Sequence, residues 1–149
     1  EAFAHKRQTP NTPALALLYA LEAQVARTVG ADGDPAAAPE PVEARWARHA
    51  AMADATHRWA EERAERFGIA VLAPAGERSP TVSAVTLPNG TDPARVVAAV
   101  RARGYVVGNG YGEGRATTFR VGHMGDHTAD GLAGCLAACE AALAEVTGR

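Results

Sequence analysis

The spacing of apolar residues along the chain switches several times between the period of a helix and that of a strand. Leu15, Leu18, Leu21 and Val25 recur at three- and four-residue intervals, so they share one face of a helix. The β-branched stretch 81–87 instead alternates apolar and polar residues, which is typical of a strand with one buried face. These patterns predict elements in the order α, α, β, β, α, β, β, α. The predicted helices begin at residue 13 and span 42–67, 92–103 and 128–146, and the predicted strands span 69–72, 81–87, 105–107 and 117–121.

Residues with special backbone properties mark the ends of these elements. Asn11 or Thr12 can cap the first helix, with Pro13 in its first turn. Gly68 ends the long second helix, and Asp92 precedes the third. Short paired strands among helices predict an α+β fold, in which helices cover one face of a small, mainly antiparallel sheet.

Composition narrows the classes of function. The 149 residues suffice for one domain that buries roughly 68–70% of its unfolded surface. A net charge of -2 disfavours a nucleic-acid partner, which requires a clustered basic face. No apolar run approaches the ~20 residues of a membrane span and no signal-peptide core opens the chain, so we expect no membrane partner. The two cysteines form no disulfide framework, which predicts a reducing cytoplasm. Cys135 and Cys139 are expected to pack as small core residues, with redox or metal chemistry as the alternative.

One arginine stands out in the fourth predicted strand. Arg120 lies in the stretch 117–121, and a glycine-rich loop at 108–115 precedes that strand. An arginine directed out of a strand beside a loop with few side chains is suited to a small carboxylate. Its planar guanidinium donates two parallel, charge-assisted hydrogen bonds that lysine cannot imitate. The alternative is a surface ion pair with Glu113 or Asp126.

Two other patterns predict no separate chemistry. The glycine loop is not expected to bind a nucleotide phosphate, because a strand rather than a helix follows it. His123, Asp126 and His127 span a strand end and a turn without a further spaced ligand, so no metal site is predicted. These three are expected to be solvated turn residues, and His49 and His57 are expected at partly exposed positions of the long helix.

Three segments carry a family resemblance: Thr9-Pro10-Asn11-Thr12-Pro13, Arg78-Ser79-Pro80-Thr81-Val82 and Thr118-Phe119-Arg120-Val121-Gly122-His123-Met124-Gly125. They resemble the class V pyridoxal-phosphate aminotransferases, which include alanine–glyoxylate, serine–pyruvate and phosphoserine aminotransferases. The resemblance covers almost the whole chain, but only the C-terminal part of such an enzyme. It implies an interdomain lead-in over 1–10 and, over 11–149, the C-terminal small domain of a fold-type I enzyme, with the large cofactor-binding domain absent.

The resemblance also implies roles for individual residues. Arg120 corresponds to the arginine that grips the α-carboxylate of the amino acid or 2-oxo acid, and Tyr111 is implied as a substrate contact. Asn11 and Thr12, with Thr9 as a further candidate, would reach across a homodimer interface to the phosphate of pyridoxal 5′-phosphate. A helix N-terminus suits an anion, because its dipole and free N–H groups favour negative charge. A plain helix cap without a ligand is the alternative.

Lysine content limits what the chain can do alone. Transamination with pyridoxal phosphate needs a lysine that holds the cofactor as a Schiff base and moves a proton. Lys6 is the only lysine, and it lies at the wrong spacing from Asn11 and Thr12 for the family's residue. We therefore expect no catalytic residue here and no activity of the chain alone; the complete transferase would be a homodimer moving an amino group between a small amino acid and a 2-oxo acid. Two alternatives stay open: a non-enzymatic α+β domain that binds a small carboxylate metabolite, and desulfuration or elimination on the same scaffold.

Overall fold

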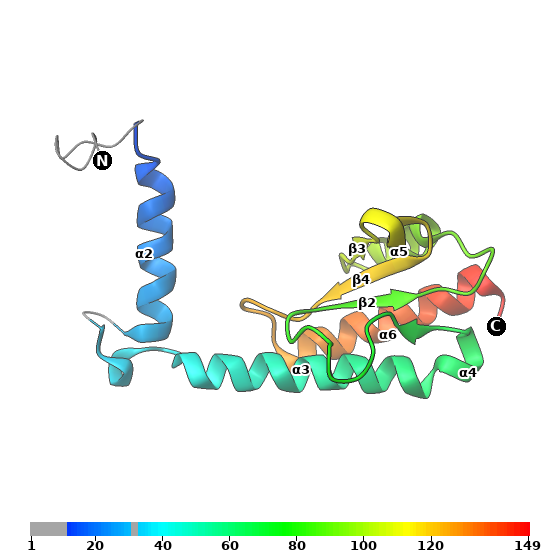
Figure 1. Cartoon of the computed structure of the whole chain (residues 1–149), viewed down its shortest axis with the longest axis horizontal. Coiled ribbons are helices and arrows are strands. Elements are labelled where there is room, and N and C mark those ends of the chain that lie inside the picture. The colour runs from blue at the N-terminus through cyan, green and yellow to red at the C-terminus, as the bar shows by residue number, and fades with distance from the viewer. Residues whose placement is uncertain (1–11, 31–32) are drawn as a thin grey trace. The chain divides into compact units, whose positions relative to one another are not determined.

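The computed structural model describes residues 12–30 and 33–149. The chain divides into two compact units, Glu1–Trp46 and Ala47–Arg149 (Figure 1).

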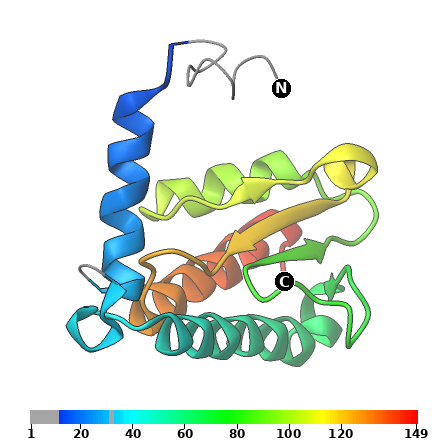
Figure 2. The same cartoon turned by 60° about the vertical axis from the view of Figure 1, so that its left-hand side comes forward.

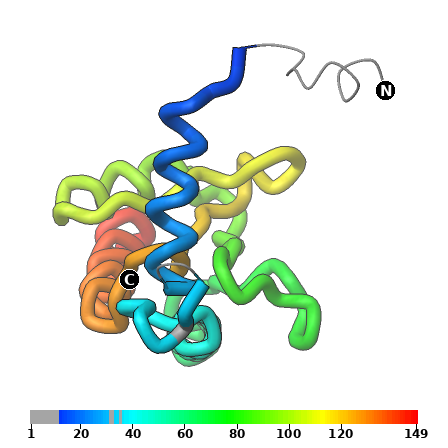
Figure 3. The backbone as a smooth tube through the Cα atoms, turned by 90° about the vertical axis from the view of Figure 1, so that its left-hand side faces the viewer, coloured from blue at the N-terminus to red at the C-terminus, as the bar shows by residue number. Residues whose placement is uncertain are grey.

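The first unit contains helix α2 (Leu15–Val29), drawn in blue in Figure 3. Its N-cap is Ala14, and no side chain caps it, so the predicted cap at Thr12 is wrong; Asn11 lies outside the described residues. No residue of α2 is buried, and its leucines are more than half exposed. The short 3-10 helix η2 (Pro35–Ala37) follows, within the predicted loop.

The second unit is built on a four-stranded antiparallel sheet in the order β1-β2-β4-β3 (Figure 1). The strands are β1 (Ala70–Val71), β2 (Val82–Thr86), β3 (Gly108–Asn109) and β4 (Thr118–Gly122). In the register of the central pair, Ala84 lies opposite Arg120, and Val85 lies opposite Phe119. The predicted α+β class and its antiparallel sheet are confirmed.

Helices cover one face of this sheet. They are α3 (Val42–Glu62), α4 (Ala64–Phe67), α5 (Pro93–Ala102) and α6 (Ala129–Thr147). In Figure 2 the strands lie in front and α6 passes behind them, and Figure 3 shows α5 and α6 side by side, where they pack together. The largest fully buried apolar side chains between sheet and helices are those of Phe67, Phe119, Met52, Leu143, Val85, Val96, Val100 and Val121.

The helix boundaries follow the polar and glycine residues that the sequence singles out. The Asp92 carboxylate accepts a hydrogen bond from the Ala94 backbone N–H at 2.9 Å, and Thr128 caps α6 in the same way. Gly68, with φ of 68°, ends α4. The long helix predicted over 42–67 is interrupted at Arg63, whose φ and ψ of -105° and 1° separate α3 from α4.

The predicted strand at 105–107 is wrong. Those residues form no strand, and pairing with β4 begins only at Gly108. Tyr105 instead packs onto α6: a Cβ built on Gly134 would lie 2.0 Å from the Tyr105 hydroxyl oxygen, so the tyrosine occupies the space that this glycine leaves open. The β-branched residues of this segment do not decide its conformation, because tertiary packing overrides local β propensity.

Candidate carboxylate-binding site

Arg120 lies on the face of the sheet that the helices do not cover. Its neighbours in β4, Phe119 and Val121, are fully buried on the helix-covered face. Successive side chains of a strand point to opposite faces, so Arg120 is directed the other way, and it is half-buried there.

The neighbouring strand makes room for the guanidinium and orients it. Gly108 lies opposite Arg120, and a Cβ built on Gly108 would lie 3.5 Å from the Arg120 Nε and Nη2 atoms. The Arg120 Nε donates a hydrogen bond of 2.8 Å to the Asn109 carbonyl oxygen, and the guanidinium carbon lies 5.9 Å from the centroid of the Tyr111 ring. Within the part of the chain that the structure describes, the two Nη groups have no hydrogen-bond or ion-pair partner.

The glycine loop packs tightly onto β4. The Gly110 backbone N–H donates to the Thr118 carbonyl oxygen at 2.9 Å, and the Thr118 hydroxyl donates to the Gly114 carbonyl oxygen at 2.7 Å. A Cβ on Gly110 would lie 2.3 Å from that same Gly114 oxygen, so only glycine fits there. The 3-10 helix η3 (Gly112–Ala116) completes the loop. Tyr111, which is 84% exposed, is the residue just before this helix.

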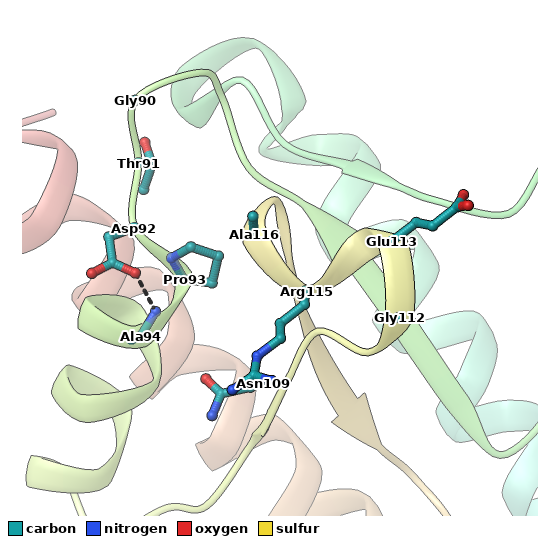
Figure 4. A pocket seen from close by; sticks show the side chains of 10 residues that line it. All are labelled: Gly90, Thr91, Asp92, Pro93, Ala94, Asn109, Gly112, Glu113, Arg115 and Ala116. Carbon is teal, nitrogen blue, oxygen red and sulfur yellow. Dashed lines mark hydrogen bonds between the residues drawn. The ribbon is translucent and has the colours of Figure 1, made fainter.

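A surface hollow of about 650 Å³ lies on the other side of Asn109. Figure 4 shows its wall: the start of α5, the residues of η3 and the Asn109 side chain, with the Glu113 carboxylate directed outward. Arg120 does not line this hollow, whose charged lining residues are Asp92, Glu113 and Arg115. The two carboxylates outnumber the single guanidinium of Arg115 in this hollow, which disfavours an anionic ligand there. The candidate carboxylate site is therefore the guanidinium of Arg120.

The predicted phosphate-binding residues belong to the first unit. Thr9 and Asn11 lie outside the described residues, and Thr12 is exposed ahead of α2. No side chain caps the helix, and its first turn holds no acidic residue. The free N–H groups of a helix N-terminus favour an anion, and the phosphate-binding role of Thr12 stays a prediction.

The predicted solvent exposure of two histidines is wrong. His123 is fully buried, and His57 is 9% exposed. The ladder between β2 and β4 continues past β4, since the His123 backbone N–H donates to the Thr81 carbonyl oxygen at 2.9 Å. The turn therefore begins after His123, whose side chain lies among the core residues. His49 is half-buried and His127 is exposed, as predicted.

No metal centre is evident among the described residues, where no group of three or more histidine, cysteine, aspartate or glutamate side chains could hold an ion. Both cysteines lie in α6, with Cys139 fully buried and Cys135 half-buried. No helix within 12–30 and 33–149 is long and apolar enough to cross a membrane.

Comparisons with known proteins identify the scaffold. No family model matches the chain. Over 136 residues it is 30% identical to the serine–glyoxylate aminotransferase of Methylorubrum extorquens, an alignment covering 90% of this chain and 31% of that enzyme. The crystal structure of pyridoxamine–pyruvate aminotransferase from Mesorhizobium loti matches with a TM-score of 0.63 and 34% identity, covering 72% of this chain and 27% of that one. The chain is thus similar to a part of class V aminotransferases that makes up less than a third of each enzyme.

A further solved structure shows the same similarity. The alanine–glyoxylate aminotransferase of Nostoc sp. matches with a TM-score of 0.60 and 27% identity, covering 70% of this chain and 27% of that one. The chain thus spans about a third or less of the length of these aminotransferases. Its sheet and helices belong to the fold-type I architecture.

Two contacts of the site are not predicted from the sequence. One is the carbonyl oxygen of Asn109, because every residue carries a carbonyl and only the β3–β4 register selects this one. The other is the buried hydrogen bond between Ser83 and His123, 2.9 Å long. The alternation of 81–87 gives no signal for it, because it places Ser83 among the polar positions, whereas the structure buries this serine.

Proposed function

We propose that this chain is the C-terminal domain of a pyridoxal-phosphate-dependent aminotransferase, in which Arg120 binds the α-carboxylate of the substrate. The observation that carries the proposal is the hydrogen bonding of its guanidinium. The Nε is held by the Asn109 carbonyl oxygen, whereas both Nη groups stay uncommitted within the described residues. An arginine oriented in this way is pre-organised for a carboxylate, because little side-chain entropy remains to be lost on binding.

The substrates we propose are a small amino acid and a small 2-oxo acid. The names of the similar enzymes include serine, alanine, glyoxylate and pyruvate. All of these carry an α-carboxylate, the group that a guanidinium fork binds with two parallel hydrogen bonds. The exposed ring of Tyr111, beside the guanidinium, would cover one side of the bound carboxylate.

The cofactor would be held jointly with other parts of a cytoplasmic homodimer. Asn11 and Thr12, with Thr9 as a third candidate, would bind the phosphate of the partner subunit's cofactor at the start of α2. Pyridoxal phosphate supplies the electron sink for the amino-group transfer. This chain's residues would bind and orient, and the lysine that anchors the cofactor would come from the large domain.

Replacement of Arg120 in the complete enzyme tests the proposal. We expect Arg120→Ala to lower kcat/KM for the amino acid and the 2-oxo acid by roughly 100-fold, since one charged hydrogen bond contributes about 1.5–3 kcal/mol. Arg120→Lys should recover only a small part, because an ammonium group cannot donate in parallel. Bound cofactor, measured by absorbance, should be unchanged in both variants. An unaltered kcat/KM for Arg120→Ala would refute the assignment.

The expected absence of a cofactor-anchoring lysine is tested on the 149-residue chain itself. We expect no covalent adduct at Lys6 when the chain is incubated with pyridoxal phosphate at stoichiometric concentration and then reduced with borohydride. Peptide mass spectrometry detects such an adduct. Specific labelling of Lys6 would show that the chain carries its own anchoring residue.

A further inference from the structure

The buried residues beneath Arg120 include a polar pair that the proposed carboxylate site does not use. The His123 Nε2 lies 2.9 Å from the Ser83 Oγ, and both side chains are buried, with 0% and 2% of their surfaces exposed. Ser83 directly precedes Ala84, the residue opposite Arg120 in the β2–β4 register. The pair therefore connects the two central strands on the face opposite the guanidinium. Ser83 is one residue from Ala84 in β2, and His123, just after β4, is three residues from Arg120.

This pair is polar within an apolar core. The His123 Nδ1 is also buried, and it meets the Pro80 backbone only outside ordinary hydrogen-bond geometry. A buried polar group needs a partner that offsets its lost hydration, so the hydrogen bond to Ser83 is what makes His123 compatible with the core. A polar pair at such a position selects one register of the strands, because a slip would separate its partners.

A slip of β4 by one residue would affect Arg120 directly. Because side chains alternate between the two faces, it would move the guanidinium from the open face to the helix-covered face, among the apolar core residues. It would also move Gly108 and the Asn109 carbonyl oxygen away from the arginine, since both meet it only in the observed register. Register is thus what gives Arg120 its direction.

Helix α3 contacts His123 and the turn that follows it. The His57 ring lies edge-on to the His123 ring, with centroids 6.3 Å apart, and the His57 Nε2 lacks a partner among the described residues. Along the same helix, the Arg48 Nη2 donates to the Gly125 carbonyl oxygen at 3.0 Å, which holds the turn that follows β4. The end of β4 is therefore fixed by a surface arginine and by a buried histidine.

We infer that His123 is a positioning residue for the carboxylate site: through its hydrogen bond to Ser83 it holds the register of β2 and β4 in which Arg120 faces the substrate. This inference rests on the proposed role of Arg120. Four charged or titratable groups face the two rings. Besides burial, Arg78 lowers the pKa of His57, whereas Asp54 and Glu61 raise it. Besides burial, His57 and His49 both lower the pKa of His123. Burial lowers the pKa of both His57 and His123, so both rings are neutral at neutral pH.

Three variants of the complete enzyme test the inference. His123→Leu removes the hydrogen bond at similar volume, and Ser83→Ala removes it from the other end with a smaller change in packing. His123→Gln keeps an amide group near the position of the imidazole Nε2 and should preserve the bond. His127→Gln, at an exposed histidine in the turn that follows His123, is the matched control.

We expect His123→Leu and Ser83→Ala to raise KM for both substrates about tenfold, with kcat and bound cofactor changed less than about twofold, because a small misplacement of a binding group is costly. His123→Gln should restore KM. A variant that lowers only the melting temperature, with KM unchanged well below it, would show a structural role and overturn the inference. Should His123→Leu fail to fold, the KM of Ser83→Ala tests the inference by the same criterion. Arg120→Ala is assayed in parallel: if it too leaves KM unchanged, the proposed function fails, whereas an effect of Arg120→Ala alone removes only the role of His123.

Discussion

Gly108 faces Arg120 across the β3–β4 pair, and the missing side chain of the glycine leaves the space in which the guanidinium lies. A Cβ at Gly108 would be 3.5 Å from the Arg120 Nε and Nη2 atoms, which is an ordinary van der Waals contact. An alanine therefore fits beside the arginine, and we expect a branched side chain to crowd it. The size of residue 108 thus sets the orientation of the arginine.

The size limit at residue 108 gives a first prediction. In the complete enzyme, Gly108→Val should push the guanidinium away from the Asn109 carbonyl oxygen and raise KM for both substrates at least about tenfold, as expected for a displaced binding group. Gly108→Ala should stay within about twofold of the wild type. Steady-state kinetics with each substrate measures both. Equal KM values for the valine and alanine variants would show that the space beside Arg120 is unimportant.

The two buried histidines predict a dependence of stability on pH. Burial lowers the pKa of His57 and His123 below the ordinary 6.5, so the unfolded chain takes up protons first as the pH falls. Stability from these groups is complete above pH 6.5 and decreases below it, by up to about 1.4 kcal/mol per pH unit for each histidine. Denaturant unfolding between pH 7.5 and 5.5 measures this slope.

Histidine variants show which residues cause the dependence of unfolding free energy on pH. His57→Gln and His123→Gln should each flatten the dependence between pH 6.5 and 5.5, and the exposed His127→Gln should leave it as it is. A slope that survives in the double variant of His57 and His123 would assign the effect to other groups.

The cysteines of α6 should differ in reactivity. Cys139 is fully buried, and its pKa is raised by the hydrogen bond to Cys135 and by burial. Cys135 is half-buried, and the hydrogen bond with Cys139 lowers its pKa. A thiol reagent such as DTNB should therefore label one cysteine in the native chain and two after unfolding, because the thiolate is the reactive form.

Substitution identifies the labelled cysteine. Cys135→Ser should abolish native labelling, and Cys139→Ser should retain it. Rapid labelling of both thiols in the native chain would contradict the assignment. It would also strengthen the rival hypothesis of desulfuration, which calls for an accessible, reactive cysteine.

The cap of α5 gives a prediction about stability alone. Removing the Asp92 carboxylate in Asp92→Ala leaves the Ala94 N–H without its 2.9 Å partner and should lower the free energy of unfolding by about 0.5–2 kcal/mol. Asp92→Asn keeps an accepting oxygen and should lose much less. Thermal unfolding of the two variants measures the difference. An alanine variant as stable as the asparagine variant would show that the cap contributes nothing.

The elements that could be predicted from the sequence are those stabilised by local interactions. The strand at 81–87, the helix after Asp92 and the helix after Thr128 all form within a residue or two of their predicted positions. Their signals are periodicity and capping, which depend on residues close together in the chain. The same holds for the α+β class, which follows from the order of the elements.

What the sequence by itself determined was the chemistry available: one arginine in a strand, a glycine loop before it, and helices with recognisable ends. Tertiary structure decided where each group lies. It moved the strand expected at 105–107 to Gly108, placed His57 and His123 in the core, and paired the Asn109 carbonyl oxygen with Arg120. The physical reason is range: periodicity and caps are set within a few residues, whereas register, burial and the partner of a carbonyl group depend on segments tens of residues apart, which only the packed fold brings together.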